Sequence, residues 1–420
     1  MKVLVIGSGG REHAVIRKLA ENKEITHLYC APGNGGIRAQ AQTVNIAATD
    51  VEKMVDFAKR EGIDFVVVTP DDPLVLGMAD AMEAAGIPAF GPSRAAARIE
   101  GSKVFAKNLM QKYGIPTAQY AVFSDPAAAL DYIRRRNRFP AVIKADGLAL
   151  GKGVVIAQDL DEARAALHTI MEEKIFGQSG SQVVVEEFLT GKEVSVLAFT
   201  DGHVVRPMVS SMDHKRAYDN DEGPNTGGMG TIAPSPYYTP EVAERCMREI
   251  FLPTMEAMNR EGCPFRGCLY FGLILTADGP RVIEYNCRFG DPETQVVLPL
   301  LQSDLFSILR AVREERLSRA DITWRDGAAA CVVLASGGYP KKYQTGFPIT
   351  GLDADGGHAG AIVYHAGTKW QDGQYLTAGG RVLGVTGLGD TLEEAIRRAY
   401  AAAADIRFEN RHYRTDIGRK

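Results

Sequence analysis

Apolar residues in the first hundred positions fall into short runs that alternate with longer amphipathic stretches. The apolar runs predict buried strands, and the amphipathic stretches predict helices. The expected strands are residues 3–6, 26–30 and 65–69, and the expected helices are residues 13–22, 51–60 and 74–85. Strands that alternate with helices are typical of a parallel sheet with helices on both faces, where ligands bind at the carboxyl ends of the strands. We therefore expect residues 1–101 to form a doubly wound, Rossmann-like domain.

The pattern changes after residue 102, where strands and helices no longer alternate one by one. Helices are expected at residues 103–113, 125–136, 240–259 and 305–316, and strands at residues 119–123, 141–145, 183–188, 268–276 and 281–286. The last two strands flank Ala277-Asp278-Gly279, which favours a hairpin turn. Residues 102–325 are expected to contain a small mobile lobe at about 119–190 and a larger lobe at about 191–325.

The tail, residues 326–420, has short apolar runs separated by many glycine-containing turns, with one helix expected at residues 391–406. Short strands joined by turns favour an antiparallel sheet. The chain is therefore predicted to be a multidomain protein that combines the α/β and α+β classes, with a small, mainly antiparallel C-terminal domain.

Composition narrows the class of protein. Of 420 residues, 45% are hydrophobic and 24% are charged, as in ordinary globular proteins. The net charge of -4 argues against general affinity for nucleic acid or an anionic membrane. The six cysteines have no paired C-x-x-C spacing, so neither a disulfide framework nor a zinc site is indicated. No apolar run could span a bilayer and no signal-peptide core is present, so a cytoplasmic protein is expected.

The segment from Val282 to Glu293 carries the strongest chemical signal. It begins as a strand in which apolar residues alternate with Glu284 and Asn286, and Arg288 follows on the same face. Two oxygen ligands side by side suit Mg²⁺, which binds few protein oxygens together with substrate phosphates. An arginine beside them can bind a carboxylate or phosphate through two hydrogen bonds. The alternative is an edge strand whose polar face is simply hydrated.

A glycine turn, Gly7-Ser8-Gly9-Gly10, follows the first strand and opens a helix that begins with Arg11 and Glu12. Backbone N–H groups at such a turn can approach an anion at the positive end of the helix. Glu12 stands where a dinucleotide fingerprint has its third glycine, which weakens an oxidoreductase interpretation. Phosphate binding is the favoured interpretation, and a merely tight turn is the alternative.

A second glycine-rich loop, residues 146–153, follows Lys144 between two strands. It is not a Walker A loop, because Gly153 replaces the required Ser or Thr. A strand-borne lysine followed by such a hairpin can still clamp phosphates and exclude water. The alternative is a flexible hairpin tip.

Two further segments have possible binding roles. Residues 183–189 form an apolar strand that ends in acids, on which an adenine could dock, with Glu193 accepting from ribose hydroxyls. Residues 225–230 are rich in backbone donors that suit a carboxylate or oxyanion, and Asp213-His214-Lys215-Arg216 lies just upstream. A solvated strand exit and a surface loop are the respective alternatives.

Together these segments resemble the ATP-grasp superfamily, and within it the phosphoribosylamine–glycine ligase family. The matching segments follow in the family's order over essentially the whole chain: residues 5–13, 144–153, 211–215, 225–230, 284–293, 365–368 and 379–382. Two of these segments are specific to this ligase family: Asn-Cys-Arg-Phe-Gly-Asp-Pro-Glu and Asn-Thr-Gly-Gly-Met-Gly. Another ATP-grasp carboxylate–amine ligase or carboxylase, and a non-catalytic nucleotide sensor, are the competing interpretations.

The resemblance implies an ATP-dependent ligase of de novo purine biosynthesis. Glycine would be phosphorylated to glycyl phosphate, and 5-phosphoribosylamine would then attack it to give glycinamide ribonucleotide, ADP and phosphate. The implied metal ligands, for Mg²⁺ or Mn²⁺, are Glu284 and Asn286. The implied catalytic residues are Arg288, Asp213 and Lys215. The implied ATP-binding residues are Lys103, Lys144, Gly151, Lys152, Gly153, Glu186, Glu187, Leu189 and Glu193. The implied substrate-binding residues are Gly9, Gly10, Arg11, Asp213, Lys215, Thr226, Gly227, Gly228, Arg288, Gly290 and Asp291.

The implied partners are small-molecule substrates, without nucleic acid or membrane, and the implied state is a monomer, with a weak homodimer as the alternative. The sequence departs from the family pattern at Tyr270, where many ATP-grasp relatives have an acidic metal ligand, and at Ala378, where asparagine is expected. Asp71 or Asp72 replaces an expected glutamate at the substrate edge. Glu284 is expected to be an exposed ligand whose loss barely changes thermal stability.

Overall fold

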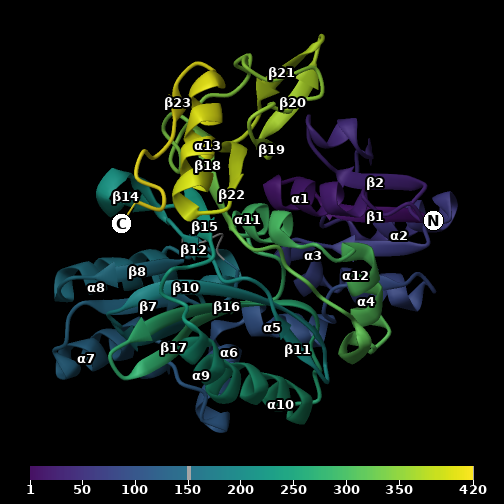
Figure 1. Ribbon diagram of the computed structural model, residues 1–420. Helices are drawn as coiled ribbons and strands as arrows, with labels where there is room; N and C mark the ends of the chain where they lie inside the picture. The colour runs from purple at the N-terminus through teal and green to yellow at the C-terminus, as the bar shows by residue number, and fades with distance from the viewer. Residues whose placement is uncertain (149–152, 420) are drawn as a thin grey trace.

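The computed structural model describes residues 1–148 and 153–419 (Figure 1). Its N-terminal part is a parallel five-stranded sheet in the order β3-β2-β1-β4-β5. The strands are β1 (Lys2–Gly7), β2 (His27–Pro32), β3 (Gln42–Thr43), β4 (Phe65–Val68) and β5 (Ala89–Phe90). The helices are α1 (Gly10–Leu19), α2 (Val51–Glu61), α3 (Asp71–Leu76), α4 (Met78–Ala84) and α5 (Arg94–Gly101). The predicted parallel α/β architecture is confirmed.

Two helix predictions in this part were inaccurate. The helix expected at residues 74–85 is two helices, α3 and α4, because Gly77 between them is in the left-handed conformation at φ +90°. It also begins earlier, at Asp71, where two aspartates in the first turn complement the helix dipole. The helix expected at residues 13–22 begins at Gly10, directly after the glycine turn.

The middle of the chain forms two lobes, seen at the lower left and the bottom of Figure 1. The small lobe has the sheet β6-β9-β7-β8, and the larger lobe has the antiparallel sheet β11-β10-β16-β17. The small-lobe elements are β6 (Tyr120–Phe123), α7 (Pro126–Arg136), β7 (Ala141–Ala145), β8 (Val154–Ala157), α8 (Leu160–Leu167) and β9 (Val183–Glu187). A separate hydrophobic cluster that includes Ile143, Leu167 and Val183 fills the small lobe.

The larger lobe is built on long, buried strands covered by helices. Its elements are α6 (Lys103–Tyr113), β10 (Lys192–Asp201), β11 (Val205–Pro207), α9 (Pro240–Cys246), α10 (Leu252–Arg260), β16 (Arg266–Thr276), β17 (Gly279–Asn286), α11 (Thr294–Val297) and α12 (Leu305–Arg313). The expected helix at residues 240–259 contains a π-helical turn at Met247–Phe251. The expected β16–β17 hairpin is confirmed, with Thr276 paired to Gly279.

The tail contributes to a sheet that it shares with the middle of the chain. The order is β12-β15-β18-β22-β19, with β23 paired to β18. Its strands are β12 (Met212–Asp213), β15 (Gly230–Ala233), β18 (Ala328–Ser336), β19 (Ile362–His365), β22 (Arg381–Gly389) and β23 (Arg411–His412). The tail also contains the hairpin β20 (Thr368–Gln371) and β21 (Gln374–Thr377), and α13 (Leu392–Asp405). The sheet crosses the expected boundary at residue 325, because β15 pairs with β18.

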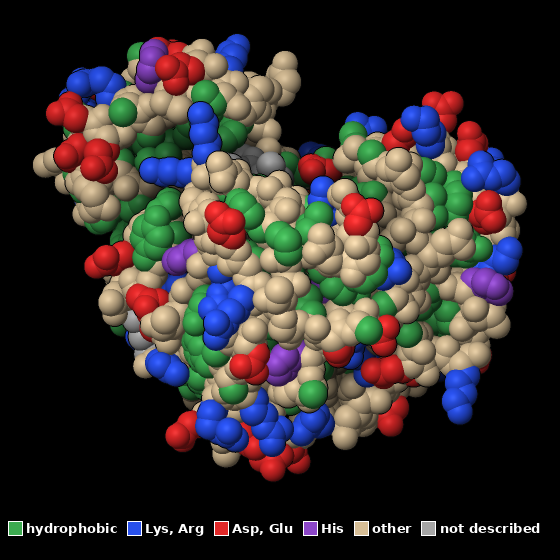
Figure 2. All heavy atoms as spheres, turned by 90° about the horizontal axis from the view of Figure 1, so that it is seen from above, with side chains coloured by type: hydrophobic (Ala, Val, Ile, Leu, Met, Phe, Trp, Pro, Cys, Tyr) green, Lys and Arg blue, Asp and Glu red, His purple; other side chains and the backbone are tan. Residues whose placement is uncertain are grey.

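The surface seen from above carries both signs of charge. Figure 2 shows Lys and Arg side chains interspersed with Asp and Glu over this face, and a notch between two parts of the molecule at its upper edge. Among the helices of the described residues, none combines the length and apolar character needed to cross a membrane.

Buried histidines join the tail to the first domain. The backbone N–H of His365 at the end of β19 donates to Nδ1 of His13 in α1, at 2.8 Å. His365 is itself held by Thr368 at 2.9 Å and by the Gly356 carbonyl at 2.8 Å. Burial lowers the pKa of His365 to about 4, so this ring is neutral at physiological pH.

We expect the protein to lose stability on acidification between about pH 6.5 and pH 4. In that window the unfolded chain binds a proton at His365 that the folded chain does not, which costs about 3 kcal/mol of unfolding free energy by pH 4. His365→Gln should reduce this pH dependence, measured by urea unfolding at several pH values. His27→Gln, at an exposed position, should leave the pH dependence unchanged, and equal slopes in all three proteins would contradict the prediction.

Candidate active site

A β-bulge in β17 sets the direction of the predicted metal ligands. Gly272 of β16 faces Glu284 and Leu273 faces Val282, which leaves Ile283 as an extra residue in β17. Strict alternation would put Val282 and Glu284 on one face. The bulge instead lets Val282 join the hydrophobic core with Tyr285. Glu284 and Asn286 therefore share the opposite face of the strand.

Glu284 lies among four cationic side chains. Burial alone would raise the pKa of its carboxyl group, but the positive charges of Lys215, Lys144, Lys103 and Arg288 lower it. Within the described residues, no side chain donates a hydrogen bond to this carboxylate. Glu284 is only partly accessible, so the expectation of an exposed ligand was wrong. The hairpin that carries it is packed against cations from both lobes.

Arg288 links the predicted ligands to the first domain. Its Nη2 donates to Asn286 Oδ1 at 3.1 Å and forms an ion pair with Glu100 of α5 at 3.2 Å. The other Glu100 oxygen accepts from the backbone N–H of Cys287 at 2.7 Å. Arg288 Nε is buried and has no hydrogen-bond partner among the described residues. The guanidinium group is thus fixed on one side and keeps a donor for an anionic ligand.

The two predicted phosphate lysines come from separate elements. Lys144, in β7, donates to the Ile283 carbonyl at the bulge at 3.2 Å. Lys103, at the start of α6, donates to the Gly147 carbonyl at 2.8 Å. The backbone N–H of Ala145 donates to the Gly153 carbonyl at 2.8 Å, which closes the base of the loop. Gly151 and Lys152 lie outside the described residues.

The predicted adenosine-binding residues differ in their surroundings. Glu186 is buried, and its carboxylate pairs with Lys107 and Lys144 at 3.0 Å each. Glu187 Oε1 accepts from the backbone N–H of Gln119 at 2.9 Å. Leu189 is partly exposed just after β9. Glu193 is exposed and pairs with Lys215 at 3.3 Å.

Asp213 and the loop at residues 225–230 lie together. Gly228 has φ +108°, and a Cβ there would lie 2.8 Å from Asp213 Oδ1 and 2.5 Å from Pro292. Only glycine allows the loop backbone to approach both segments this closely. Thr226 Oγ1 donates to the Lys215 carbonyl at 2.8 Å and accepts from Gly228 N at 3.0 Å, so its hydroxyl group orders the loop.

Two carboxyl groups lie next to this loop, Asp213 half-buried and Glu293 buried. Burial, followed by the negative charge of Glu293, raises the pKa of Asp213 well above its ordinary value. Burial also raises the pKa of Glu293. Tyr270 donates to Glu293 Oε1 at 3.2 Å and contacts the Ser195 hydroxyl at 2.7 Å. Tyr270 therefore supports a neighbouring carboxyl group from the position at which the sequence resemblance implied an acidic metal ligand.

The glycine turn of the first domain is organised by Glu12. Glu12 Oε2 accepts from the Gly9 N–H at 2.5 Å, and Oε1 pairs with Arg11 Nε at 2.6 Å. Arg11 also donates to the Phe289 carbonyl at 3.1 Å. Glu12 thus fits where a dinucleotide fingerprint would need glycine, because it caps the turn and holds Arg11 against the segment after β17.

Asp291 is the point at which three parts of the chain meet. A Cβ at Gly9 would lie 3.3 Å from Asp291 Oδ2, and Arg381 from the tail pairs with the same carboxylate at 3.0 Å. Arg381 also donates to the Asp291 carbonyl at 2.9 Å and to the Gly227 carbonyl. Gly290 contributes its carbonyl, which accepts from Thr294 Oγ1 at 2.6 Å. Gly10 lies against the Gln295 side chain.

Asp71 rather than Asp72 faces this region. Burial would raise the pKa of Asp71, but the positive charges of Arg288 and Arg11 lower it. Asp72 is exposed and lies at the surface of α3. Asp71 is therefore the better candidate for the position at which a glutamate was expected.

Sequence reasoning missed Arg381, Lys107 and Glu100 as members of the site. The sequence did point to Arg381, because Gly379-Gly380-Arg381-Val382 is one of the segments that carry the family resemblance. The sequence did not point to Glu100 or Lys107. Each lies in a helix far along the chain from the charged residue that it pairs with.

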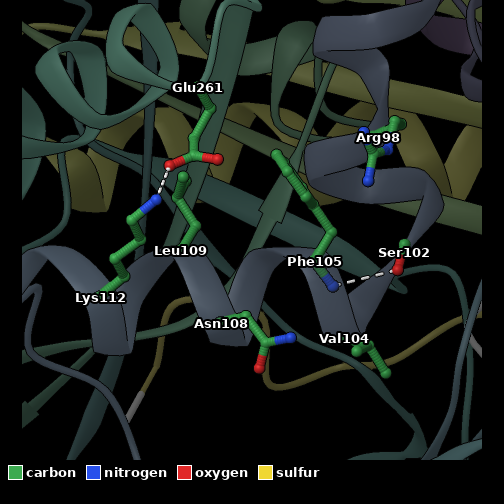
Figure 3. A pocket seen from close by; sticks show the side chains of 8 residues that line it. All are labelled: Arg98, Ser102, Val104, Phe105, Asn108, Leu109, Lys112 and Glu261. Carbon is green, nitrogen blue, oxygen red and sulfur yellow. Dashed lines mark hydrogen bonds and ion pairs between the residues drawn. The ribbon is translucent and has the colours of Figure 1, made fainter.

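A separate depression of about 230 Å³ lies along the outer side of α6 (Figure 3). Figure 3 shows Lys112 pointing toward Glu261 across it, and this pair is 2.6 Å apart. Its lining residues are Arg98, Ser102, Val104, Phe105, Asn108, Leu109, Lys112 and Glu261. Among the residues that the structure describes, no predicted site residue lines this depression, so it is a surface feature apart from the described part of the candidate active site.

Comparison with known proteins gives matches along nearly the whole chain. Three family models match, described as the phosphoribosylglycinamide synthetase N domain over residues 1–100, its ATP-grasp (A) domain over residues 101–294 and its C domain over residues 329–420. The chain is 48% identical over 417 residues to a phosphoribosylamine–glycine ligase of Caldanaerobacter subterraneus, covering 99% of each. It is 50% identical over 419 residues to that of Rhizobium meliloti, covering 100% of this chain and 98% of the relative.

Solved structures agree with the observed fold. A crystal structure of phosphoribosylamine–glycine ligase from Thermotoga maritima matches with a TM-score of 0.87 and 34% identity over 100% of both chains. The biotin carboxylase domain of Hydrogenobacter thermophilus 2-oxoglutarate carboxylase matches with a TM-score of 0.76 and 19% identity, over 98% of this chain and 91% of that one. The second match shows a shared fold alone, and together they confirm the predicted ATP-grasp architecture.

Proposed function

The chain belongs to the phosphoribosylamine–glycine ligase family, and from that premise we propose how its residues carry out the reaction. It is an ATP-dependent ligase of de novo purine biosynthesis that joins glycine to 5-phosphoribosylamine. In the proposed sequence, a glycine carboxylate oxygen attacks the γ-phosphorus of ATP, and ADP leaves. The phosphoribosylamine nitrogen then attacks the acyl carbon of glycyl phosphate. The C–O bond to phosphate breaks, and the nitrogen loses a proton.

The single observation that carries the proposal is the group formed by Glu284, Asn286 and Arg288. It faces lysines from both lobes, and phosphoryl transfer needs mainly positioning and neutralisation of charge. Lys144 and Lys103 would bind the ATP phosphates. The free Nε of Arg288 supports binding of the glycine carboxylate or the transferring phosphoryl group. Glu186, Glu187, Leu189 and Glu193 would surround adenosine, with Glu186 acting through its backbone because its side chain is occupied.

The donor set fits a hard divalent cation. Glu284 and Asn286 present a carboxylate without a hydrogen-bond donor and an amide oxygen, and the described residues contain no cluster of three metal-binding side chains. Such a site needs phosphate oxygens to complete it, as magnesium sites commonly do. Glu284 and Asn286 would hold Mg²⁺ or Mn²⁺. When bound, the ion would neutralise charge on the phosphates.

Asp213 is the proposed proton acceptor for the second step. Its raised pKa, caused by burial and then by Glu293, places a carboxyl group of unusual basicity next to the loop at residues 225–230. The amine must lose a proton as the amide bond forms, and a general base with a pKa nearer to neutral is more effective. The positive charge of Lys215 interacts with the carboxylates of Glu284 and Asp213. Lys215 would also stabilise the departing phosphate.

The remaining substrate contacts surround Asp291. Phosphoribosylamine is proposed to bind between the first domain and the loop, at Gly9, Gly10, Arg11, Thr226, Gly227, Gly228, Gly290 and Asp291. We also propose domains at residues 1–101, 102–325 and 326–420, a monomeric state and a cytoplasmic location. All six cysteines are free and buried, which suits a reducing compartment.

Phosphate release tests the function directly. With ATP and Mg²⁺, phosphate should appear only when glycine and freshly prepared phosphoribosylamine are both added, and glycinamide ribonucleotide should accumulate in equal amount. Phosphate release that depends on bicarbonate would instead indicate a carboxylase. Absence of turnover under all conditions, with ATP still bound, would indicate a nucleotide sensor.

A further inference from the structure

Lys107 is a buried lysine that the proposed reaction does not use. It lies in α6, and its side chain is 3% exposed. Its Nζ contacts Glu186 Oε2 at 3.0 Å and donates to Thr117 Oγ1 at 2.8 Å. The other Glu186 oxygen, Oε1, forms an ion pair with Lys144 Nζ at 3.0 Å. One carboxylate therefore lies between two ammonium groups, in a place from which water is largely excluded.

The charge balance of this triad differs from that of a simple pair. Lys144 and Glu186 alone would be neutral, and a neutral pair attracts a polyphosphate weakly. Lys107 brings the net charge of the three groups to +1. In a partly buried site, one unit of charge several ångströms from a phosphate contributes about 1–2 kcal/mol. Lys107 thus leaves the positive charge of Lys144 available to an anion.

The same triad is anchored to the strand that carries the metal ligands. Thr117 Oγ1 donates to the Val282 carbonyl at 2.7 Å, and Lys144 donates to the Ile283 carbonyl at 3.2 Å. Both carbonyl groups belong to the bulge directly before Glu284. Lys107 therefore connects α6, through Thr117, to Val282 of β17, and Lys144 connects β7 to the next residue, Ile283.

We propose that Lys107 is a positioning residue for ATP: it offsets the charge of Glu186 and so holds Lys144 with its positive charge directed to the nucleotide phosphates. This inference rests on the proposed function of Lys144. Lys107 contacts Glu186 and Thr117 and would not touch ATP. Its loss should therefore weaken ATP binding much more than it slows the chemical steps.

Kinetics of Lys107→Met test the charge balance. We expect KM for ATP to rise about 10- to 50-fold, with kcat and KM for glycine within about threefold of wild type. Lys112→Met is the matched control on the same helix, because Lys112 pairs with Glu261 at the surface depression (Figure 3). It should leave KM for ATP unchanged.

The pH dependence distinguishes charge from packing. Burial, together with the positive charge of Lys144, lowers the pKa of Lys107 to about 8, although Glu186 and Glu187 oppose the shift. In the wild type, KM for ATP should rise as the pH increases through about 8, because Lys107 becomes neutral. Lys107→Met should show a high KM without this rise. Lys107→Arg, which keeps its charge, should show a low KM without the rise near pH 8.

If Lys107→Met does not fold, the pH dependence of KM for ATP in Lys107→Arg tests the inference on its own. An unchanged KM for ATP in Lys107→Met, or a rise near pH 8 that persists in Lys107→Arg, would overturn the inference. Wild-type turnover with both substrates is measured first, in the same preparation. Its absence would refute the proposed function, whereas normal wild-type turnover with unaffected variants would refute only the role of Lys107.

Discussion

Glu284→Gln is expected to lower kcat about a thousandfold. The substitution keeps the shape of the side chain and removes the negative charge that Glu284 places among Lys103, Lys144, Lys215 and Arg288. The proposed metal site would lose its charged ligand, so ATP bound there would keep its phosphates in the wrong arrangement for transfer. Turnover is measured by phosphate release over a range of magnesium concentrations, and the loss should be greatest at limiting magnesium.

Glu284→Gln should also have a lower thermal midpoint than the wild type, in contrast to the expectation from the sequence that stability would barely change. The nearby cations lower the pKa of Glu284, so its ionised form stabilises the folded state above the unfolded pKa, and this contribution disappears as the pH falls through the folded pKa. The difference in thermal midpoint from wild type should therefore be present at pH 7 and shrink toward pH 3.

Asp278→Asn provides a matched control for this substitution. Asp278 lies in the turn of the same β16–β17 hairpin, with a side chain that is 84% exposed. This variant should keep wild-type activity and stability. Wild-type activity of Glu284→Gln at limiting magnesium would remove Glu284 from the metal site.

The second large effect is expected at Arg288. Arg288→Met should abolish measurable turnover and lower the unfolding free energy by about 3–5 kcal/mol, because it leaves the buried Glu100 carboxylate without its cation. Adding Glu100→Gln removes the unpaired charge. The double variant should therefore recover most of the lost stability but none of the activity.

Urea unfolding and phosphate release separate the two roles of Arg288. Glu100→Gln alone serves as the control: it should keep part of the activity, because Arg288 still contacts Asn286 at 3.1 Å. Recovery of turnover in the double variant would show that Arg288 acts only by neutralising Glu100. An Arg288→Met protein as stable as wild type would show that Glu100 does not depend on it.

Much of the fold was predictable because its signals are local. The first domain follows from apolar runs that alternate with amphipathic helices, and its parallel sheet is confirmed. The β16–β17 hairpin follows from a turn sequence between two apolar strands. The split between α3 and α4 was missed, although Gly77 stood in the expected helix, because a glycine within a helical pattern is often tolerated.

The parts that could not be predicted depend on partners distant in the sequence. The sequence left a solvated strand exit open as the alternative for Glu186, yet its carboxylate is buried between Lys107 and Lys144. The bulge at Ile283 arises from pairing with β16, and the local pattern of apolar and polar residues does not predict it. The predicted trio was nevertheless brought together, because Glu284 and Asn286 both lie after the bulge on one face of β17, and Arg288 contacts Asn286 at 3.1 Å.

The sheet shared by β15 and β18 has a consequence for dividing the chain. A fragment ending near residue 325 would leave the β15 edge without its neighbour and would uncover Ile232, which is now 1% exposed. Bare strand edges of this kind pair with other chains and promote aggregation. Residues 1–325 and 326–420 therefore depend on each other for solubility, and expressing both pieces together is the way to obtain either of them folded.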